Sequence, residues 1–132
     1  MWDPQKGLSA ANIEAALDGS LKRLNTDHVD VYFAHIDDQD VPLEETFSRL
    51  IAAGKVRAIG ASNYGADRLR QALRVSASEN LPRYEVVQPA YNLYDRAEFE
   101  NSLKPVIDAE RLGAVSYFSL ASGFLTGKYG IK

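Results

Sequence analysis

Polar or aromatic residues stand at or just after the ends of four apolar stretches of this sequence. They are His35, the pair Ser62 and Asn63, Gln88, and Tyr117. A histidine ring can orient or relay a proton to a carbonyl group, and hydroxyl and amide groups can hold a planar carboxamide through paired donors and acceptors. A tyrosine offers an aromatic face on which a flat ring can stack. These residue types suit the binding of a carbonyl compound beside a ring that carries a carboxamide.

Each of these residues also has an ordinary structural interpretation. His35 could be a buried histidine that backbone groups satisfy, and Ser62 or Asn63 could cap the helix that follows. Gln88 could face solvent at the end of its strand, and Tyr117 could pack in a core. The functional interpretation is favoured because all of them recur at equivalent places in consecutive units of the chain.

The apolar stretches are predicted strands, and helices are predicted between them. The strands cover residues 29–36, 56–61, 84–88 and 114–118, and the helical spacing of apolar residues covers 9–24, 42–54, 69–76 and 99–107. In the first strand the residues at both odd and even positions are apolar, apart from Asp30 and His35, which is typical of a parallel strand covered on both faces. We therefore expect it to be buried.

Serine, asparagine, glycine and proline residues predict where the helices begin and end. Ser9 is available to cap the first helix, and Asn25 to end it. Pro42 can occupy the first turn of the second helix, which Gly54 ends. Pro105 would remove a backbone hydrogen bond from a continuous helix, so we expect a kink or a restart there.

Strand starts recur at the roughly 30-residue length of a βαβ unit, which predicts parallel strands with right-handed crossovers. Four such strands could belong to an open doubly wound sheet or to half of a closed eight-stranded barrel. An open sheet would concentrate its ligand contacts at one switch point, whereas a barrel gathers its site from the ends of several strands. The sequence therefore favours an α/β fold, a partial (β/α)8 TIM barrel with about four parallel strands, in one incomplete domain over residues 1–132.

Composition restricts the classes of partner. The chain has 132 residues, of which 45% are hydrophobic and 25% charged, and its net charge is -3 with both signs interleaved. This distribution favours neither nucleic acid nor a membrane surface. There is no apolar run of membrane-spanning or signal-peptide length, so we expect a cytoplasmic protein.

Several site classes are not indicated. The chain has no cysteine, which excludes disulfides, thiolate zinc sites and a cysteine nucleophile. It also lacks a glycine-rich dinucleotide fingerprint, a phosphate loop and a histidine pair with metal-ligand spacing, so no metal is expected. The acidic cluster over residues 37–40 is better interpreted as a solvated loop before a helix than as a cation site.

Four blocks of the sequence resemble the aldo-keto reductase family. They are LNTDHVDVYFAH at residues 24–35, AGKVRAIGASNY at 53–64, VQPAYNL at 87–93 and SYFSLASGFLTGKY at 116–129. The blocks are specific in combination and follow one another in order. The resemblance runs from about Gly7 to Tyr129.

The resemblance implies a role for each candidate residue. His35 matches the histidine that orients the substrate carbonyl, and Tyr117 matches the tyrosine that stacks on the nicotinamide ring. The residues that match those holding the nicotinamide carboxamide are Ser62, Asn63 and Gln88. Those that match the segment along the cofactor pyrophosphate are Ser119 and Leu120. The family reaction is hydride transfer from NADPH to an aldehyde or ketone, so the implied substrate is a small carbonyl compound.

The family's catalytic aspartate, tyrosine and lysine have no match in this chain. We therefore expect a truncated enzyme that reduces carbonyl compounds negligibly by itself, because a missing general acid typically costs on the order of 10² to 10⁴ in rate. The alternative is a non-catalytic half barrel that forms a homodimer or complements another chain, since four strands leave two free edges. A third possibility is a decayed fragment with no role of its own.

Overall fold

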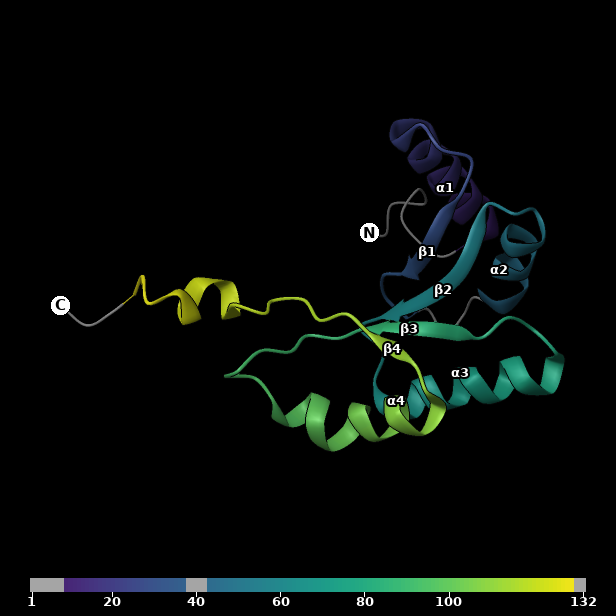
Figure 1. Cartoon of the computed structure of the whole chain (residues 1–132). Helices are drawn as coiled ribbons and strands as arrows, with labels where there is room; N and C mark the ends of the chain where they lie inside the picture. The colour runs from purple at the N-terminus through teal and green to yellow at the C-terminus, as the bar shows by residue number, and fades with distance from the viewer. Residues whose placement is uncertain (1–8, 38–42, 130–132) are drawn as a thin grey trace, which may run out of the picture.

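Strands and helices alternate along the chain in a computed structural model that describes residues 9–37 and 43–129. The elements are α1 (Ala10–Leu24), β1 (Val29–Ala34), α2 (Leu43–Ala52), β2 (Val56–Ser62), α3 (Ala66–Glu79), β3 (Tyr84–Gln88), the π-helical turn η1 (Phe99–Leu103), α4 (Lys104–Glu110), β4 (Gly113–Ala114) and the 3-10 segment η2 (Ala121–Thr126). The four expected strands and the helices before and between them are therefore present, as Figure 1 shows.

The strands form one parallel sheet in the order β1-β2-β3-β4. A doubly wound sheet would reverse its strand order at a switch point, whereas consecutive neighbours are the pattern of a barrel. No reversal occurs among the described strands, so the expected fold class is confirmed as a segment of a (β/α) barrel. The strands' carboxyl ends consequently lie at one edge of the sheet, on the left in Figure 1.

Most of the helix ends predicted from the sequence are confirmed. Asn25 has the left-handed φ of 52° that ends α1, and Gly54 has a φ of 72° just after α2. Ser9 stands at the N-cap position of α1, but its side chain makes no capping hydrogen bond, so this part of the prediction was wrong. Pro42 lies outside the described residues.

The helix before β4 restarts next to Pro105, as expected. Residues Phe99–Leu103 form a π-helical turn, and the α-helical part follows from Lys104. The amide of Lys104 donates to the carbonyl of Phe99, five residues earlier. Because proline cannot donate a backbone hydrogen bond, this wider turn lets the helix continue past it.

The hydrophobic core lies between the sheet and the helices. In its centre Phe47 of α2, 1% exposed, meets Tyr32 of β1 and Tyr84 of β3 edge to face, with ring centroids 6.4 and 6.3 Å apart. On α3 the buried residues are those that the spacing predicts, namely Leu69, Ala72, Leu73 and Ser76. The core therefore fixes the helix-facing side of the strands.

Two strand predictions need correction. The first strand ends at Ala34 instead of residue 36, and only Ala34 is fully buried in it. The helices cover one face of β1, but no described element covers its other face, so the expected burial on both faces was wrong. The fourth strand was expected over residues 114–118, but β4 contains only Gly113 and Ala114, and both are exposed.

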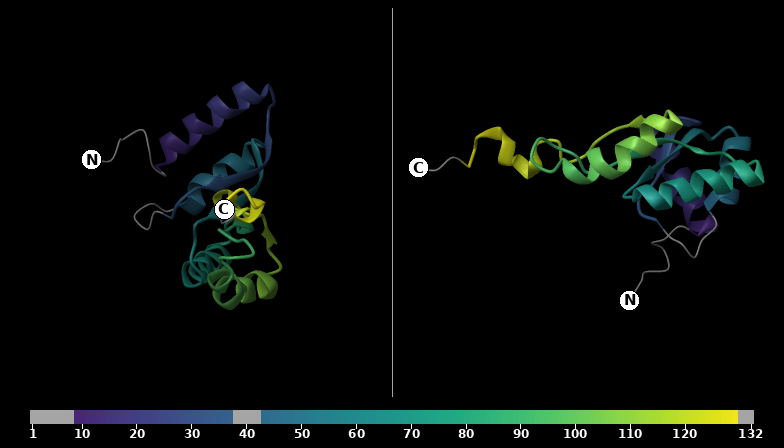
Figure 2. Two further views of the ribbon diagram at one scale, coloured as in Figure 1. Left: turned by 90° about the vertical axis from the view of Figure 1, so that its left-hand side faces the viewer. Right: turned by 90° about the horizontal axis from the view of Figure 1, so that it is seen from below.

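Beyond β4 the chain runs away from the sheet over residues 115–129, a segment that includes η2 and that we call the arm. It projects from the carboxyl edge of the sheet in Figures 1 and 2. Its large apolar side chains are mostly in solvent: Val115, Phe118, Leu120, Phe124 and Tyr129 are each more than half exposed. Backbone hydrogen bonds from Val115 to Val87 and from Tyr117 to Pro89 keep only its first residues beside β3.

Candidate functional site at the carboxyl edge of the sheet

The strand register brings the predicted site residues to adjacent strand ends. Ala34, which precedes His35, is paired with Ala61, and Ser62 is paired with Gln88. A further parallel bridge joins Ala90 to Tyr117. Residues that are far apart in sequence therefore form one row, which we call the strand-end group: His35, Ser62, Asn63, Gln88 and Tyr117.

Asn63 is the centre of this group. Its amide nitrogen donates to the backbone carbonyl of His35 at 2.8 Å and to the hydroxyl of Ser62 at 3.2 Å. Its amide oxygen accepts the hydroxyl of Tyr117 at 2.6 Å, across 54 positions of sequence. Asn63 also adopts a left-handed φ of 59°, which asparagine tolerates better than most residues. One side chain thus ties three strand ends together.

Ser62 is almost completely buried, with 1% exposure. Its hydroxyl donates to the backbone carbonyl of Gln88 at 3.2 Å. The N-cap of α3 is Gly65, and no side chain caps it. The alternative in which Ser62 or Asn63 caps the next helix is therefore wrong, because their hydrogen bonds go to neighbouring strands instead.

The other candidates differ in how firmly they are held. His35 is exposed, so it is not the buried histidine of the structural alternative, whereas Gln88 and Tyr117 are half-buried. Ser119 and Leu120 lie further out on the arm; the hydroxyl of Ser119 lies 3.2 Å from that of Ser116, and Leu120 is 59% exposed. Among the described contacts, nothing joins Ser119 or Leu120 to the strand-end group.

An ion pair between Asp37 and Arg68 lies beside the group and was missed in the sequence. The Nε of Arg68 donates to both carboxylate oxygens of Asp37, at 3.0 and 2.8 Å, and both side chains are about four-fifths buried. This pair anchors the segment after His35 to α3. Asp37 is therefore not part of a solvated loop; the rest of the acidic cluster, residues 38–40, lies outside the described residues.

Two buried tyrosines, Tyr64 and Tyr84, lie next to the Arg68 side of this ion pair. The hydroxyls of Tyr64 and Tyr84 lie 3.1 Å apart, and the guanidinium of Arg68 is 5.9 Å from the centre of the Tyr64 ring. Burial raises the pKa of Tyr64 to about 12, although the hydrogen bond with Tyr84 acts in the opposite direction. A phenol that is 5% exposed and holds its proton this tightly is a structural residue and a poor proton donor.

A hollow of about 560 Å³ opens next to the strand-end group. Its lining includes Asn63 and Tyr117 together with Pro89, Ala90 and the segment of residues 94–99. That segment is shaped by Asn92, 6% exposed, whose side-chain oxygen accepts the amides of Tyr94 and Asp95 at 2.9 and 2.8 Å. An asparagine two residues before such amides is a recognisable turn signal, but the hollow itself depends on contacts between distant segments.

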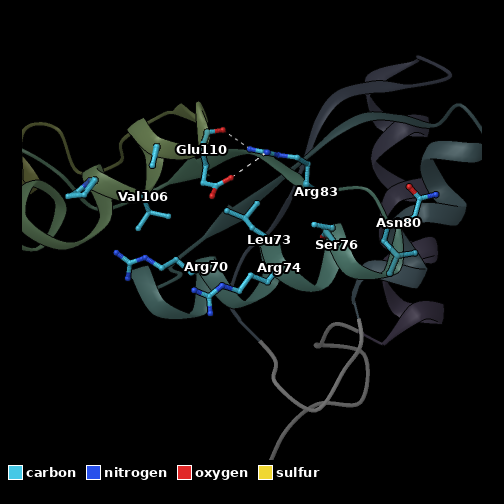
Figure 3. A pocket seen from close by; sticks show the side chains of 12 residues that line it. Arg70, Leu73, Arg74, Ser76, Asn80, Arg83, Val106 and Glu110 are labelled. Carbon is cyan, nitrogen blue, oxygen red and sulfur yellow. Dashed lines mark hydrogen bonds and ion pairs between the residues drawn. The ribbon is translucent and has the colours of Figure 1, made fainter.

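A second cavity, of about 510 Å³, lies elsewhere, between α3 and α4 (Figure 3). Three arginines line it, but Arg83 is paired with Glu110 and Arg70 is paired with Asp67. It shares no residue with the strand-end group. Among residues 9–37 and 43–129 no three histidine, aspartate or glutamate side chains come together as metal ligands, and no helix is long and apolar enough to cross a membrane.

A parallel sheet in unbroken strand order, with polar residues at the carboxyl ends of several strands, is the pattern of a segment of a (β/α) barrel. Comparison with known proteins identifies the family. The model of the aldo/keto reductase family matches residues 2–132, so the chain belongs to that family. The resemblance found in the four sequence blocks is thereby confirmed.

Several curated relatives are similar over nearly the whole chain. Aldo-keto reductase YhdN of Bacillus subtilis is 39% identical over 121 residues, which are 89% of this chain and 34% of the relative. A probable voltage-gated potassium channel subunit beta of Oryza sativa is 39% identical over 94% of the chain and 39% of its own length. L-glyceraldehyde 3-phosphate reductase of Escherichia coli is 32% identical over 98% and 38%. The chain spans well under half the length of each of these relatives.

Proposed function

We propose that the strand-end group holds the nicotinamide end of NADPH, and that the chain forms part of the site of an NADPH-dependent aldo-keto reductase. The observation that carries the proposal is the hydrogen-bonded row formed by Asn63 and Ser62, which connects amide, hydroxyl and aromatic residues of four neighbouring strand ends. The family reaction supplies a hydride from the cofactor to an aldehyde or ketone. Membership of the family supports this class of chemistry.

The remaining hydrogen-bonding capacity of the group fits a carboxamide. Both amide hydrogens of Asn63 are used within the chain, but its oxygen has accepted only the Tyr117 hydroxyl among the described contacts and keeps a second lone pair. That lone pair can accept an N–H of the carboxamide. The half-buried amide of Gln88 offers the complementary donor and acceptor from the next strand.

Two further residues, His35 and Tyr117, complete the proposed site for the nicotinamide end of the cofactor, which we call the half-site. The exposed ring of His35 stands at the end of β1, where it can donate a hydrogen bond to a substrate carbonyl. The hydroxyl of Tyr117 is fixed by Asn63, which orients the tyrosine ring for stacking against the nicotinamide. Ser119 and Leu120 would follow the pyrophosphate only if the arm closes toward the strand ends.

We further propose that the 132-residue chain by itself does not reduce carbonyl compounds at a measurable rate. None of its residues matches the family's catalytic aspartate, tyrosine or lysine. The buried phenol of Tyr64, with its pKa raised to about 12 by burial, does not replace the missing acid. Robust oxidation of NADPH that depends on this polypeptide would contradict the proposal.

The other expectations from the sequence stay predictions. They are a small carbonyl substrate, a cytoplasmic location and the absence of nucleic-acid and membrane partners. The name of the rice relative refers to a potassium channel. No described feature of this chain favours such a role over the reductase role.

The test is a titration of the purified chain with NADPH, followed by the fluorescence of the cofactor. We expect saturable binding that weakens at least about tenfold in Asn63→Gly and in Gln88→Ala, because each variant loses one half of the carboxamide contact. Glycine is chosen at position 63 because it accepts the left-handed φ of 59°.

Asn25→Gly is the matched control, since Asn25 has a similar φ of 52° and is exposed at the end of α1. Its affinity for NADPH should equal that of the unmodified chain. Equal weakening in the control and in Asn63→Gly would show that the loss reflects backbone flexibility. No binding at millimolar NADPH would refute the half-site.

A further inference from the structure

Two contacts join the segment that follows β1 to the segment that follows β2. One is the hydrogen bond from the amide of Asn63 to the backbone carbonyl of His35, at 2.8 Å. The other is the ion pair of Asp37 with Arg68, whose Nε donates to both carboxylate oxygens at 3.0 and 2.8 Å. In sequence the ion pair lies two residues beyond the hydrogen bond on one segment and five residues beyond it on the other. The ion pair therefore connects the same two segments as the hydrogen bond does.

The segment that carries His35 depends on these two contacts. Apart from the ladder of the sheet, the hydrogen bonds described for residues 35–37 are those from Asn63 and from Arg68. His35 is exposed, and Ile36 is 56% exposed. Among the described residues no hydrogen bond holds the His35 ring. The direction of this ring consequently follows from the way in which the backbone around it is fixed.

Arg68 is attached to a rigid part of the fold. Its neighbour on α3, Leu69, is 0% exposed in the core. The guanidinium of Arg68 lies 5.9 Å from the centre of the Tyr64 ring, and the hydroxyl of Tyr64 lies 3.1 Å from that of the buried Tyr84. A planar guanidinium that is held in this way fixes the direction of the carboxylate that accepts from it. The ion pair thus extends the order of the core to the segment after β1.

The burial of the ion pair separates a role in position from a role in stability. Both of its side chains are about four-fifths buried. Removal of one member of a buried ion pair is strongly destabilising, because the other charge stays without a partner. Replacement of both members by apolar residues is often neutral. A buried ion pair is therefore weak evidence for a gain in stability, and its place beside the strand ends favours a role in positioning.

We propose that Asp37 and Arg68 are positioning residues of the strand-end group. Their ion pair fixes the backbone around His35, so that the carbonyl of His35 stays within reach of the Asn63 amide. The same backbone sets the direction of the exposed histidine ring. The consequence for NADPH rests on the function proposed above, whereas the effect on Asn63 does not depend on it.

Loss of the ion pair would release one end of the Asn63 amide. The nitrogen of this amide is directed by the carbonyl of His35 and the hydroxyl of Ser62, and its oxygen by the hydroxyl of Tyr117. Because the amide group is planar, a shift of its nitrogen also turns its oxygen. The second lone pair of this oxygen is the acceptor that we assign to the nicotinamide carboxamide. The ion pair therefore sets the direction of that contact.

The first test needs no cofactor. Leucine is placed at both positions, as Asp37→Leu with Arg68→Leu, because this removes the ion pair without leaving an unpaired charge. Nuclear magnetic resonance then follows the side-chain amide of Asn63 in the nitrogen-labelled chain. We expect its signals to shift, and the hydrogen bonded to the His35 carbonyl to exchange with solvent at least about tenfold faster. Unchanged Asn63 signals in the folded variant, with or without a lower unfolding midpoint in urea, would overturn the proposal.

Asp67→Leu with Arg70→Leu is the matched control. It removes an ion pair of 2.7 Å from the same helix, but there the side chains are 44% and 100% exposed. The Asn63 signals should stay as in the unmodified chain. If the leucine pair at positions 37 and 68 does not fold, Arg68→Lys replaces it, because lysine keeps the charge but lacks the planar fork. Asn63 signals that do not shift in Arg68→Lys would then overturn the proposal.

The second test is the dissociation constant for NADPH. It should rise at least about fivefold in Asp37→Leu with Arg68→Leu and change less than about twofold in the control. On the background of Asn63→Gly the same leucine pair should add less than about twofold, because the ion pair acts through Asn63. Full additivity would contradict this route. If the unmodified chain does not bind NADPH, the proposed function fails, while the Asn63 signals still decide whether the ion pair positions the group.

Discussion

β2 and β4 belong to the same parallel sheet, yet they differ in almost every property. β2 extends over seven residues, most of them buried, whereas β4 consists of two exposed residues. Both segments are rich in small and apolar residues. Among the described strands, β2 has a neighbour on each side, while β4 is paired with β3 alone. β1 also has one described neighbour and is six residues long, but only one of its residues is fully buried. Neighbours on both edges therefore go with deep burial in this sheet, whereas strand length does not follow from them alone.

The largest effect that tests this comparison comes from one phenylalanine in the core and one in the arm. Phe47→Ala should lower the free energy of unfolding by about 3–5 kcal/mol, because Phe47 is 1% exposed and contacts two tyrosine rings. Phe118→Ala should change it by no more than about 0.5 kcal/mol, because Phe118 is 63% exposed. Urea denaturation followed by circular dichroism at low protein concentration measures both.

The two variants also distinguish a single chain from an assembly. If Phe118→Ala proves as destabilising as Phe47→Ala, the arm must be covered in solution, and the contrast between the two regions would disappear. A large effect of Phe118→Ala that grows with protein concentration would point to coverage by a second chain.

A smaller effect on the free energy of unfolding should appear at alkaline pH, and it should depend on a tyrosine of the core and not on one of the arm. Burial raises the pKa of Tyr64 to about 12, above the ordinary value of 10, so the folded chain holds this proton more tightly than the unfolded chain. The resulting stability is fully present below pH 10 and is lost as the pH rises from 10 to 12. It amounts to roughly 2–3 kcal/mol for a shift of this size.

The measurement is the free energy of unfolding between pH 9 and 12 in Tyr64→Phe and in the unmodified chain. The variant should lose less stability over this range, whatever the lysines and other tyrosines contribute to both proteins. Tyr129→Phe, a change at a residue of the arm that is 64% exposed, is the control and should behave like the unmodified chain. Parallel curves for Tyr64→Phe and the unmodified chain would show that Tyr64 does not carry this dependence.

Local patterns were sufficient to predict most of the fold. The inner face of α3, the restart of the helix at Pro105 and the turn at Gly54 follow from spacing and backbone chemistry that lie within a few residues. The end of β4 and the open face of β1 could not be predicted in this way. Both depend on what lies across the sheet edge, and sequence periodicity does not contain that information.

The same distinction between local patterns and contacts of distant residues applies to the candidate site. Spacing could place His35, Ser62, Gln88 and Tyr117 at strand ends, because parallel strands share one carboxyl edge. It could not predict that Asn63 would form hydrogen bonds with His35, Ser62 and Tyr117, since those contacts depend on strand register and on its left-handed φ. The pairing of Asp37 with Arg68 was missed for the same reason, because the two residues are 31 positions apart.

A further small effect concerns the hydrogen bond that joins the arm to the body of the sheet. Tyr117→Phe removes the hydroxyl that donates to Asn63 but keeps the aromatic ring, so it should cost only about 0.5–1 kcal/mol of stability. If the bond also orients the ring, the dissociation constant for NADPH should rise about two- to fivefold. Tyr117→Ala should weaken binding further, because the stacking face is lost as well. Cofactor affinity that is unchanged in Tyr117→Phe but reduced in Tyr117→Ala would mean that the ring acts without help from Asn63. In that case the arm would be positioned by its backbone pairing with β3 alone.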